Sequence, residues 1–179
     1  AGSGANGTAG YPPASNSRTL GPQHQMANLF RGAGYTAYTD SCVGGQNAQA
    51  YYLWDTRFTA GTGWATGATG SATLATTFTR PHYNNSTTNP LTFQPELNVD
   101  TFIVHYAIRT SAGSFNWSLD GGSSTNVSVQ GASNAVGSFT VNAGSVGSHQ
   151  LSISRVSGSI YILAIEAYDD RKSTRLNSS

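Results

Sequence analysis

The sequence predicts a mainly β protein: an antiparallel, jelly-roll-like β-sandwich preceded by a partial α/β segment of loop, helix and strand. From about Phe58 onward, apolar residues alternate with Thr, Ser and Asn, which is the pattern of strands with one buried face. Turn residues separate these runs roughly every 8–12 residues, as in sandwich folds. Charged residues make up only 9% of the chain and aromatic residues 11%, so the composition is that of a folded, turn-rich protein.

The segment 1–57 is predicted to be part of an α/β unit. It opens with a loop rich in Gly, Ser, Asn and Pro. A helix is expected over residues 19–31, because Met26, Leu29 and Phe30 then share one apolar face. The run YTAYTD that follows has the composition of a strand. Loop, helix and strand form half of a βαβ unit, so we expect a domain boundary near the end of this segment.

The β-sandwich is predicted over residues 58–169, with one strand for each alternating run. Asp120–Gly122 and Ser157–Gly158 are expected to be tight turns between neighbouring strands. Ile160–Ala167 is apolar on both faces, which predicts a central strand. The alternating runs lie at 72–79, 102–109, 114–118, 127–129, 151–156 and 160–168.

The distribution of charge argues against a nucleic-acid partner. The formal net charge is +1, but three of the nine basic residues lie in the last ten residues, DRKSTRLNSS. Without these ten residues, which also include Asp170, six basic and seven acidic residues remain. The predicted fold therefore has no excess of basic residues. This tail resembles the translation of a common sequencing adapter, and residues 170–179 are therefore expected to be non-native. The longest apolar run, IYILAI, is too short to cross a membrane, so no membrane partner is expected.

Cysteine and histidine patterns predict no metal or redox site. Cys42 is the only cysteine, which rules out an internal disulfide, and we interpret it as a small buried apolar residue. The four histidines are scattered without metal-ligand spacing. The run GSGANG lacks the Lys-Ser/Thr of a phosphate loop. No metal and no cofactor are expected, and the uncharged polar composition favours an extracellular or virion-associated location.

Two stretches are more distinctive: DSCVGGQN at 40–47 and SGSIYILAIEAYD at 157–169. Together with the order of Gly-rich opening, helix, strand and sandwich, they resemble a branch of the SGNH (GDSL-type) hydrolases. In that branch a β-sandwich is inserted early in the α/β hydrolase domain, and the resemblance covers nearly all of residues 1–169. It implies a nucleophilic serine before Ala1, oxyanion-hole and Asp-x-x-His blocks beyond Asp169, and therefore a chain that lacks the catalytic triad.

Ser41 is the one internal candidate for a nucleophile, because it follows the predicted strand. Thr39 stands before the Asp-Ser pair where the family has Gly, and none of the histidines has Asp three residues earlier. The alternative role of Ser41 is to bond the backbone of a turn, so no catalytic residue is assigned within the chain. The resemblance implies that the rim of the active site is formed by Gly44, Gly45, Gln46 and Asn47.

Aromatic and polar residues are the candidates for binding sugar. Aromatic rings can stack on sugar rings, and RPHYNNSTTNP at 80–90 is a polar loop with proline near each end, suited to recognition. Trp117 alternates with polar residues and is expected to lie in the core. For Trp64 the alternative is a place in the core. His105 is expected to be a satisfied residue within a strand. Glu166 is expected to reach solvent or pair with an arginine, with a buried functional carboxylate as the alternative. The expected ligand-binding residues are Trp64, Tyr83, Arg80, Asn84, Tyr52 and Trp54.

Two hypotheses for the function follow. The first is a fragment of a secreted or virion-associated SGNH-type serine ester hydrolase acting on acylated glycans, with the sandwich as an accessory domain that shapes access of the substrate. The alternative is a non-catalytic glycan- or receptor-binding module, as in a phage tail fibre or an adhesin. Both predict a carbohydrate partner, and the oligomeric state stays open in both.

Overall fold

The computed structural model describes residues 29, 42–43, 57–66 and 81–169, and everything below refers to these residues. They contain short strands at the start and long ones toward the end. The strands are β1 (Cys42–Val43), β2 (Phe58–Ala60), β3 (Trp64–Thr66), β4 (His82–Asn84), β5 (Leu91–Phe93), β6 (Val99–Ile108), β7 (Ser114–Leu119), β8 (Thr125–Ser128), β9 (Ala135–Gly147), β10 (Leu151–Ser157) and β11 (Ile160–Tyr168).

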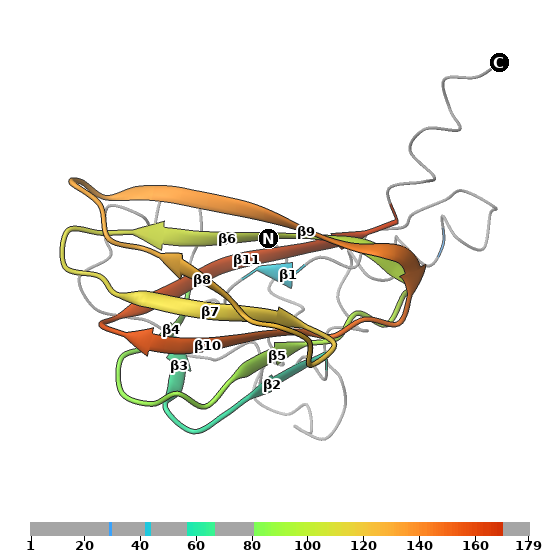
Figure 1. Cartoon of the computed structure of the whole chain (residues 1–179), viewed down its shortest axis with the longest axis horizontal. Helices are drawn as coiled ribbons and strands as arrows, with labels where there is room; N and C mark the ends of the chain where they lie inside the picture. Colours follow the sequence, from blue (N-terminus) through green and yellow to red (C-terminus); the bar gives the residue numbers. More distant parts are fainter. Residues whose placement is uncertain (1–28, 30–41, 44–56, 67–80, 170–179) are drawn as a thin grey trace, which may run out of the picture.

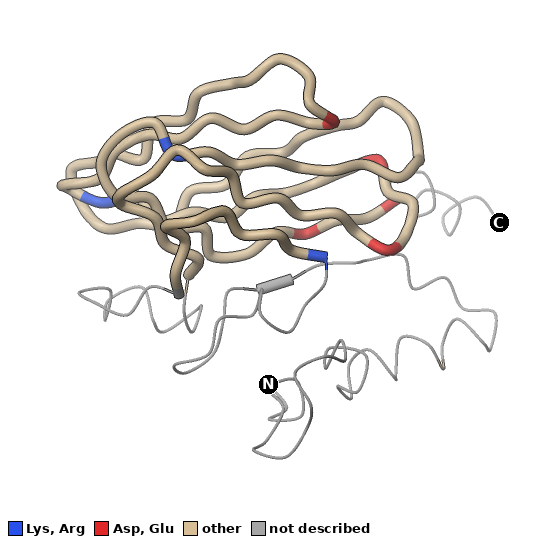
Figure 2. The backbone as a smooth tube through the Cα atoms, turned by 90° about the horizontal axis from the view of Figure 1, so that it is seen from below, with Lys and Arg blue, Asp and Glu red and all other residues tan. Residues whose placement is uncertain are grey.

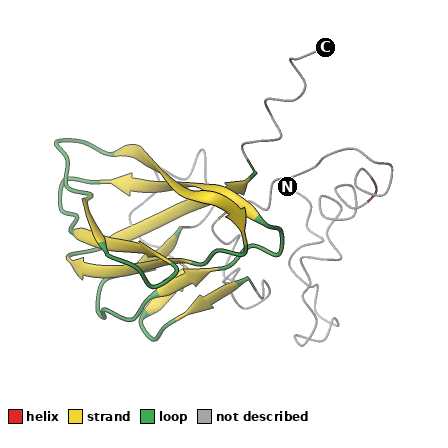
Figure 3. Cartoon of the chain, turned by 45° about the vertical axis from the view of Figure 1, so that its right-hand side comes forward, coloured by secondary structure: helices red, strands yellow, loops and turns green. Residues whose placement is uncertain are grey.

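The strands form an antiparallel β-sandwich, as predicted. The larger sheet has six strands in the order β3-β4-β11-β6-β9, with β1 as an additional partner of β11. The smaller sheet has five strands in the order β2-β5-β10-β7-β8. The two sheets stack as two layers (Figures 1 and 3). No helix in the described part of the chain is long and apolar enough to cross a membrane.

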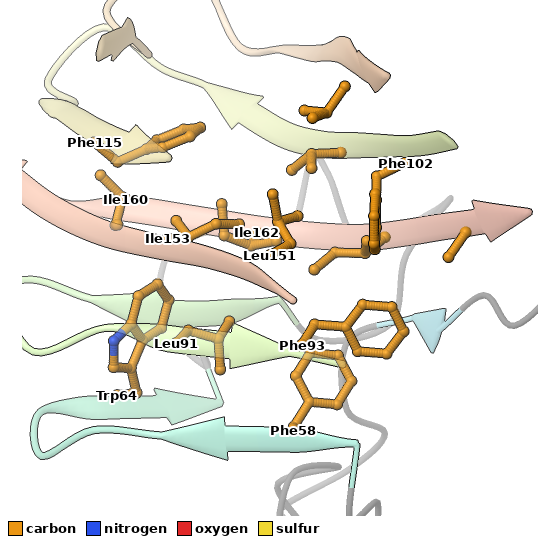
Figure 4. Packing of buried hydrophobic residues seen from close by; sticks show 14 of the residues in the cluster. Phe58, Trp64, Leu91, Phe93, Phe102, Phe115, Leu151, Ile153, Ile160 and Ile162 are labelled. Atoms are coloured by element: carbon orange, nitrogen blue, oxygen red, sulfur yellow. The ribbon is translucent and has the colours of Figure 1, made fainter. Parts of the chain in front are cut away.

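The core lies between the two sheets and is made by the inward side chains of both (Figure 4). Phe93, Phe102 and Phe115 are completely buried there, and the rings of Phe93 and Phe102 meet edge to face across the layers. Burying a side chain of this size stabilises the fold by roughly 1.5–3 kcal/mol. Trp117 also packs against this core, where its ring stacks on Phe139 with 5.5 Å between centroids. Trp117 therefore lies at the core, as expected from its sequence pattern.

The predicted central strand and tight turns are confirmed. β11 pairs with β4 and β1 along one edge and with β6 along the other. In the turn after β7, Gly122 N–H donates to Leu119 O at 2.8 Å. Asp120 and Gly121 have φ values of 51° and 71°, the left-handed conformations that an Asp-Gly hairpin turn requires.

Several elements differ from the sequence prediction. The short strands β2, β3 and β5 lie outside the predicted alternating runs. The run 80–90 is not a loop throughout, because its residues 82–84 form β4 between β3 and β11. β9 is a strand of 13 residues that the alternation did not predict. Its side chains are small and mostly exposed, so a contrast between an apolar and a polar face is missing along much of its length.

The segment before residue 57 contributes one strand to the sandwich. Cys42 and Val43 form β1 and pair with Ile165 and Ala164 of β11. The larger sheet thus includes a strand from before the expected domain boundary. Of the expected helix, only Leu29 is among the described residues; it is helical, with 74% of its surface exposed. The strands expected at 35–40 and 72–79 lie outside the described residues, as does the tail 170–179.

Candidate functional site

The outer face of the larger sheet, turned away from the core, gathers aromatic, apolar and charged side chains. Ile160 and Ile162 of β11 point into the core. Because side chains alternate along a strand, Tyr161 and Leu163 lie on the opposite face. This face includes Tyr83 of β4, Tyr161, Leu163 and Glu166 of β11, His105 and Ala107 of β6, and Arg109 just after β6.

Tyr83, Tyr161 and Arg109 form a stack across three strands of this face. Tyr83 and Tyr161 are direct partners in register, and their ring centroids are 4.8 Å apart. The Arg109 guanidinium carbon lies 4.9 Å from the centroid of the Tyr161 ring, and Nη1 donates to Tyr161 Oη at 2.7 Å. Burial raises the pKa of the Tyr161 hydroxyl above its usual 10.0, although the charge of Arg109 acts in the opposite direction. Tyr161 is therefore a neutral acceptor held beside a fixed cation.

The second feature of this face is the pair of His105 and Glu166. His105 Nε2 lies 2.6 Å from Glu166 Oε1, and the two side chains are 22% and 46% exposed. The predicted role of His105 as a satisfied sheet residue agrees with this geometry. The sequence predicts that Glu166 reaches solvent or pairs with an arginine. It is partly exposed to solvent, and its ionic partner is His105, which lies diagonally across from it because the register pairs His105 with Ala164 and Glu166 with Ile103. The pair is a partly solvated link between two central strands.

Trp64 lies in the core rather than on a binding face. It is only 6% exposed, and Figure 4 labels its ring among the core side chains. Its indole Nε1–H donates to Asn89 O at 2.7 Å. The expectation that Trp64 stacks on sugar is corrected to the core role, because β3 turns this side chain inward.

Asn84 is completely buried and builds a loop instead of meeting a ligand. Its Oδ1 accepts hydrogen bonds from the backbone N–H groups of Ser86 and Thr87, at 3.0 and 3.2 Å. This is the Asx-type turn by which asparagine bends the chain after a strand. Three of the ligand-binding residues expected from the sequence, Trp64, Tyr83 and Asn84, are among the described residues. Of these three, Tyr83 lies on the outer face of the larger sheet.

The loop 85–90, which we call the polar loop, is fixed against the turn between β2 and β3. Thr87 Oγ1 and Asn89 Nδ2 both donate to Thr62 O, and Gly61 N–H donates to Pro90 O at 2.8 Å. Several of its polar side chains stay exposed on this anchored backbone: Asn85, Ser86, Thr88 and Asn89. The polar loop begins two residues after Tyr83, directly after the end of β4.

Most of the other predicted site residues lie outside the described part of the chain, and their assignments stay predictions. This holds for the proposed rim and for three of the aromatic and basic candidates. The residues concerned are Ser41, Gly44, Gly45, Gln46, Asn47, Tyr52, Trp54 and Arg80.

A second histidine–carboxylate pair, which the sequence pattern did not indicate, lies at the end of β7. His149 Nδ1 is 2.7 Å from Asp120 Oδ2, although the two residues are 29 positions apart. The other ring nitrogen, Nε2, lies 2.9 Å from Ser145 O. A catalytic base needs that nitrogen for its nucleophile, so this pair has a structural role. Within the described ranges there is no group of three or more His, Cys, Asp or Glu side chains placed to hold a metal ion.

Comparison with known proteins identifies the fold. No family model and no curated protein matches the chain. The crystal structure of a two-domain esterase (CEX) active on acetylated mannans, co-crystallized with mannopentaose, superimposes with a TM-score of 0.54 and 10% identity, over 73% of this chain and 37% of the other. A family two carbohydrate esterase from Cellvibrio japonicus superimposes with a TM-score of 0.50 and 10% identity, over 73% of this chain and 33% of the other. The chain thus spans about a third of the length of these proteins, and at such identity the likeness shows the fold alone.

Proposed function

We propose that this chain is the β-sandwich part of an SGNH-type serine ester hydrolase that acts on acylated glycans. The observation that carries the proposal is the likeness of its fold to part of two carbohydrate esterases. The resemblance of DSCVGGQN and SGSIYILAIEAYD to the SGNH hydrolases supports it independently, since it rests on sequence. The proposal includes a secreted or virion-associated parent and a sandwich that comprises the strands from about residue 58 onward together with β1.

We place the glycan-facing surface at Tyr83, Arg109 and the polar loop. The half-buried ring of Tyr83 provides an apolar surface on β4, and Arg109 provides a fixed cation on the same face. The exposed amides and hydroxyls of the polar loop can donate to and accept from sugar hydroxyls. A few fixed polar groups beside an aromatic surface are what small-molecule recognition needs, and an anchored loop loses little entropy on binding.

In this proposal the chain positions the glycan, and other segments of the parent protein cleave the ester. Acyl transfer requires a hydroxyl within hydrogen-bond reach of a base and donors aimed at the developing oxyanion. The resemblance assigns these groups to blocks outside this sequence. The chain alone is therefore expected to bind acylated glycan without hydrolysing it.

The test compares binding and hydrolysis. The chain is run in a native gel containing acetylated mannan, and in parallel in a gel containing the same polymer after chemical deacetylation. We expect retardation by the acetylated polymer and no release of acetate above the buffer rate. The gene extended on both sides is expected to release acetate and to be blocked by a serine-directed phosphonate. Retardation without activity of the extended protein would leave the non-catalytic module as the function, and absence of both contradicts the proposal.

A pair of variants locates the binding surface. Tyr83→Leu keeps an apolar side chain of moderate size but removes the flat ring, so it should weaken retardation. Ser152→Ala, in the middle strand of the smaller sheet, is the matched control and should leave retardation unchanged. Thermal unfolding of both variants checks that each remains folded at the temperature of the gel. Equal retardation of Tyr83→Leu and the wild type would move the proposed surface away from Tyr83.

A further inference from the structure

His149 lies between two groups that can only accept hydrogen bonds. Its Nδ1 is 2.7 Å from a carboxylate oxygen of Asp120, and its Nε2 is 2.9 Å from the carbonyl oxygen of Ser145. A neutral imidazole carries one N–H and can donate to only one of them. The imidazolium carries two and can donate to both. The observed geometry with ionised Asp120 is therefore that of the protonated ring.

The two hydrogen bonds of His149 connect the two sheets. Ser145 belongs to β9 in the larger sheet, and Asp120 follows β7 in the smaller sheet. Asp120 is itself held in place, because its Oδ1 accepts from Gln150 N–H at 2.7 Å and its own N–H donates to Gln150 O at 2.9 Å. The imidazolium ring is thus a bridge between a fixed carboxylate and the backbone of β9.

The part of β9 that His149 holds is the part that leaves the regular ladder. The pairing of β6 with β9 shifts between Val99, opposite Gly147, and Thr101, opposite Asn142. Residues 143–146 form the resulting bulge, in which Gly144 has φ of 79° and donates its N–H to Asn142 Oδ1 at 2.7 Å. A bulge disrupts the ladder locally, so its conformation depends more on side-chain contacts such as the bond from His149.

We propose that His149 is a pH-sensitive clamp that ties the β9 bulge to the turn after β7 while its ring is protonated and releases one of its two bonds when the ring loses the proton. The titratable groups that act on the ring are Asp120 from the turn after β7 and Asp100 from β6, both carboxylates. Release loosens the bulge and the β9–β10 loop, while the core between the sheets stays packed. The inference rests on the geometry of this end of the sandwich and is independent of the proposed function.

The electrostatics agree with this geometry and set the pH window. The hydrogen bond with Asp120 raises the pKa of His149 above its usual 6.5 against the opposing effect of burial. Burial pushes the pKa of Asp120 upward, but the hydrogen bonds from Gln150 and His149 bring it below its usual 3.8. The clamp is therefore complete between pH 3.8 and 6.5. Its contribution is lost as pH rises through the pKa of folded His149, and as pH falls through that of folded Asp120.

The direct test is NMR on the chain as it stands. The ring of His149 is titrated, and amide hydrogen exchange of residues 143–150 is followed across the same range. We expect His149 to titrate above pH 6.5, and the protection factors of these amides to fall about tenfold when it does, the usual weight of one hydrogen bond to a charged group. Amides in the middle of β6 should show no step. A His149 titration at or below 6.5, or unchanged protection through the titration, would overturn the clamp.

Asp120→Asn separates the clamp from a general effect of pH. Asparagine tolerates the left-handed backbone at this position, and its Oδ1 can still accept from Gln150 N–H. Its amide can donate to Nδ1 while Nε2–H donates to Ser145 O, so both contacts form with a neutral ring. We expect a lower pKa for His149 and a loop that stays protected through the titration. Persistence of the wild-type step in this variant contradicts the proposal.

The matched control is His105→Gln, which removes the other histidine–carboxylate pair of the described structure. The ring of His105 lies on the outer face of the larger sheet and contacts Glu166. Its register partner on β9 is Ser138, which lies outside the bulge at 143–146. The step in protection at 143–150 should remain in this variant. Its disappearance would show that the step originates elsewhere and would overturn the assignment to His149.

Discussion

The outer faces of the two sheets follow the same alternation but carry different chemistry. On the larger sheet the outward positions of β4, β6 and β11 hold tyrosines, Leu163 and the His105–Glu166 pair, followed by Arg109. On the smaller sheet the outward positions hold short hydroxyl and amide side chains in register across the strands. These are Thr59, Thr92, Asn116, Ser118, Asn126, Ser152 and Ser154. Figure 2 shows that the charged positions gather toward the ends of the sandwich.

The outward side chains of the two sheets also differ in how deeply they are buried. Leu163 and Ala107 are completely buried and Tyr161 is 7% exposed, although all three point away from the core. The outward residues of the smaller sheet are half-buried or exposed, as on an antiparallel sheet that faces water. Leu163, Ala107 and Tyr161 are thus already covered by other atoms of this chain. The outer face of the larger sheet is therefore packed along the middle of β11, whereas the outer face of the smaller sheet meets water.

The largest expected effect is that of Leu163→Ala. Truncating a completely buried leucine costs about 2–5 kcal/mol, because apolar contact is lost and a cavity remains. Ser152→Ala at an outward position of the smaller sheet should change the free energy of unfolding by less than about 0.5 kcal/mol. Urea unfolding of both variants measures the contrast. Similar costs for the two substitutions would remove the distinction between the faces.

Next in size is Tyr161→Phe, which keeps the ring beside Tyr83 and removes only the acceptor of the Arg109 hydrogen bond. A hydrogen bond to a charged group contributes about 1.5–3 kcal/mol, and partial exposure places this one near the lower end. The control is Thr92→Val, which removes an exposed 3.4 Å bond from Thr92 Oγ1 to Thr59 O. Unfolding monitored by fluorescence measures both. A loss no greater than that of the control would mean that the hydrogen bond from Arg109 does not stabilise this face.

The alternation in the sequence is sufficient to predict the sandwich, the central strand and the turns after β7 and β10. It misses β9 because small exposed side chains give no contrast between faces, and it misses β4 because proline and asparagine next to it indicate a loop. The stack of Tyr83, Tyr161 and Arg109 joins β4, β11 and the residue just after β6, so it depends on register that local pattern does not contain. The same holds for His105 with Glu166 and for His149 with Asp120.

A smaller effect is expected for the His105–Glu166 pair. Both side chains are partly solvated, and such pairs contribute about 0.2–1 kcal/mol that salt reduces. A double-mutant cycle with His105→Gln and Glu166→Gln isolates the coupling between them. We expect a favourable coupling at low salt that shrinks at high salt. A coupling that is large and independent of salt would indicate that this pair is shielded from water and belongs with the buried part of the face.

The smallest effect should come from Asn116→Ala on the smaller sheet. Asn116 Oδ1 accepts from Asn126 Nδ2 at 2.8 Å, but the bond is exposed, so water can replace the lost acceptor. Asn126 also donates to Phe115 O at 3.3 Å, which keeps its amide partly satisfied in the variant. We therefore expect a change of less than about 0.5 kcal/mol in unfolding and no change in retardation by acetylated mannan. A clear loss of retardation with stability intact would move the binding surface to the smaller sheet and reverse the comparison, since the burial of Tyr161 and Leu163 would then have to serve packing alone.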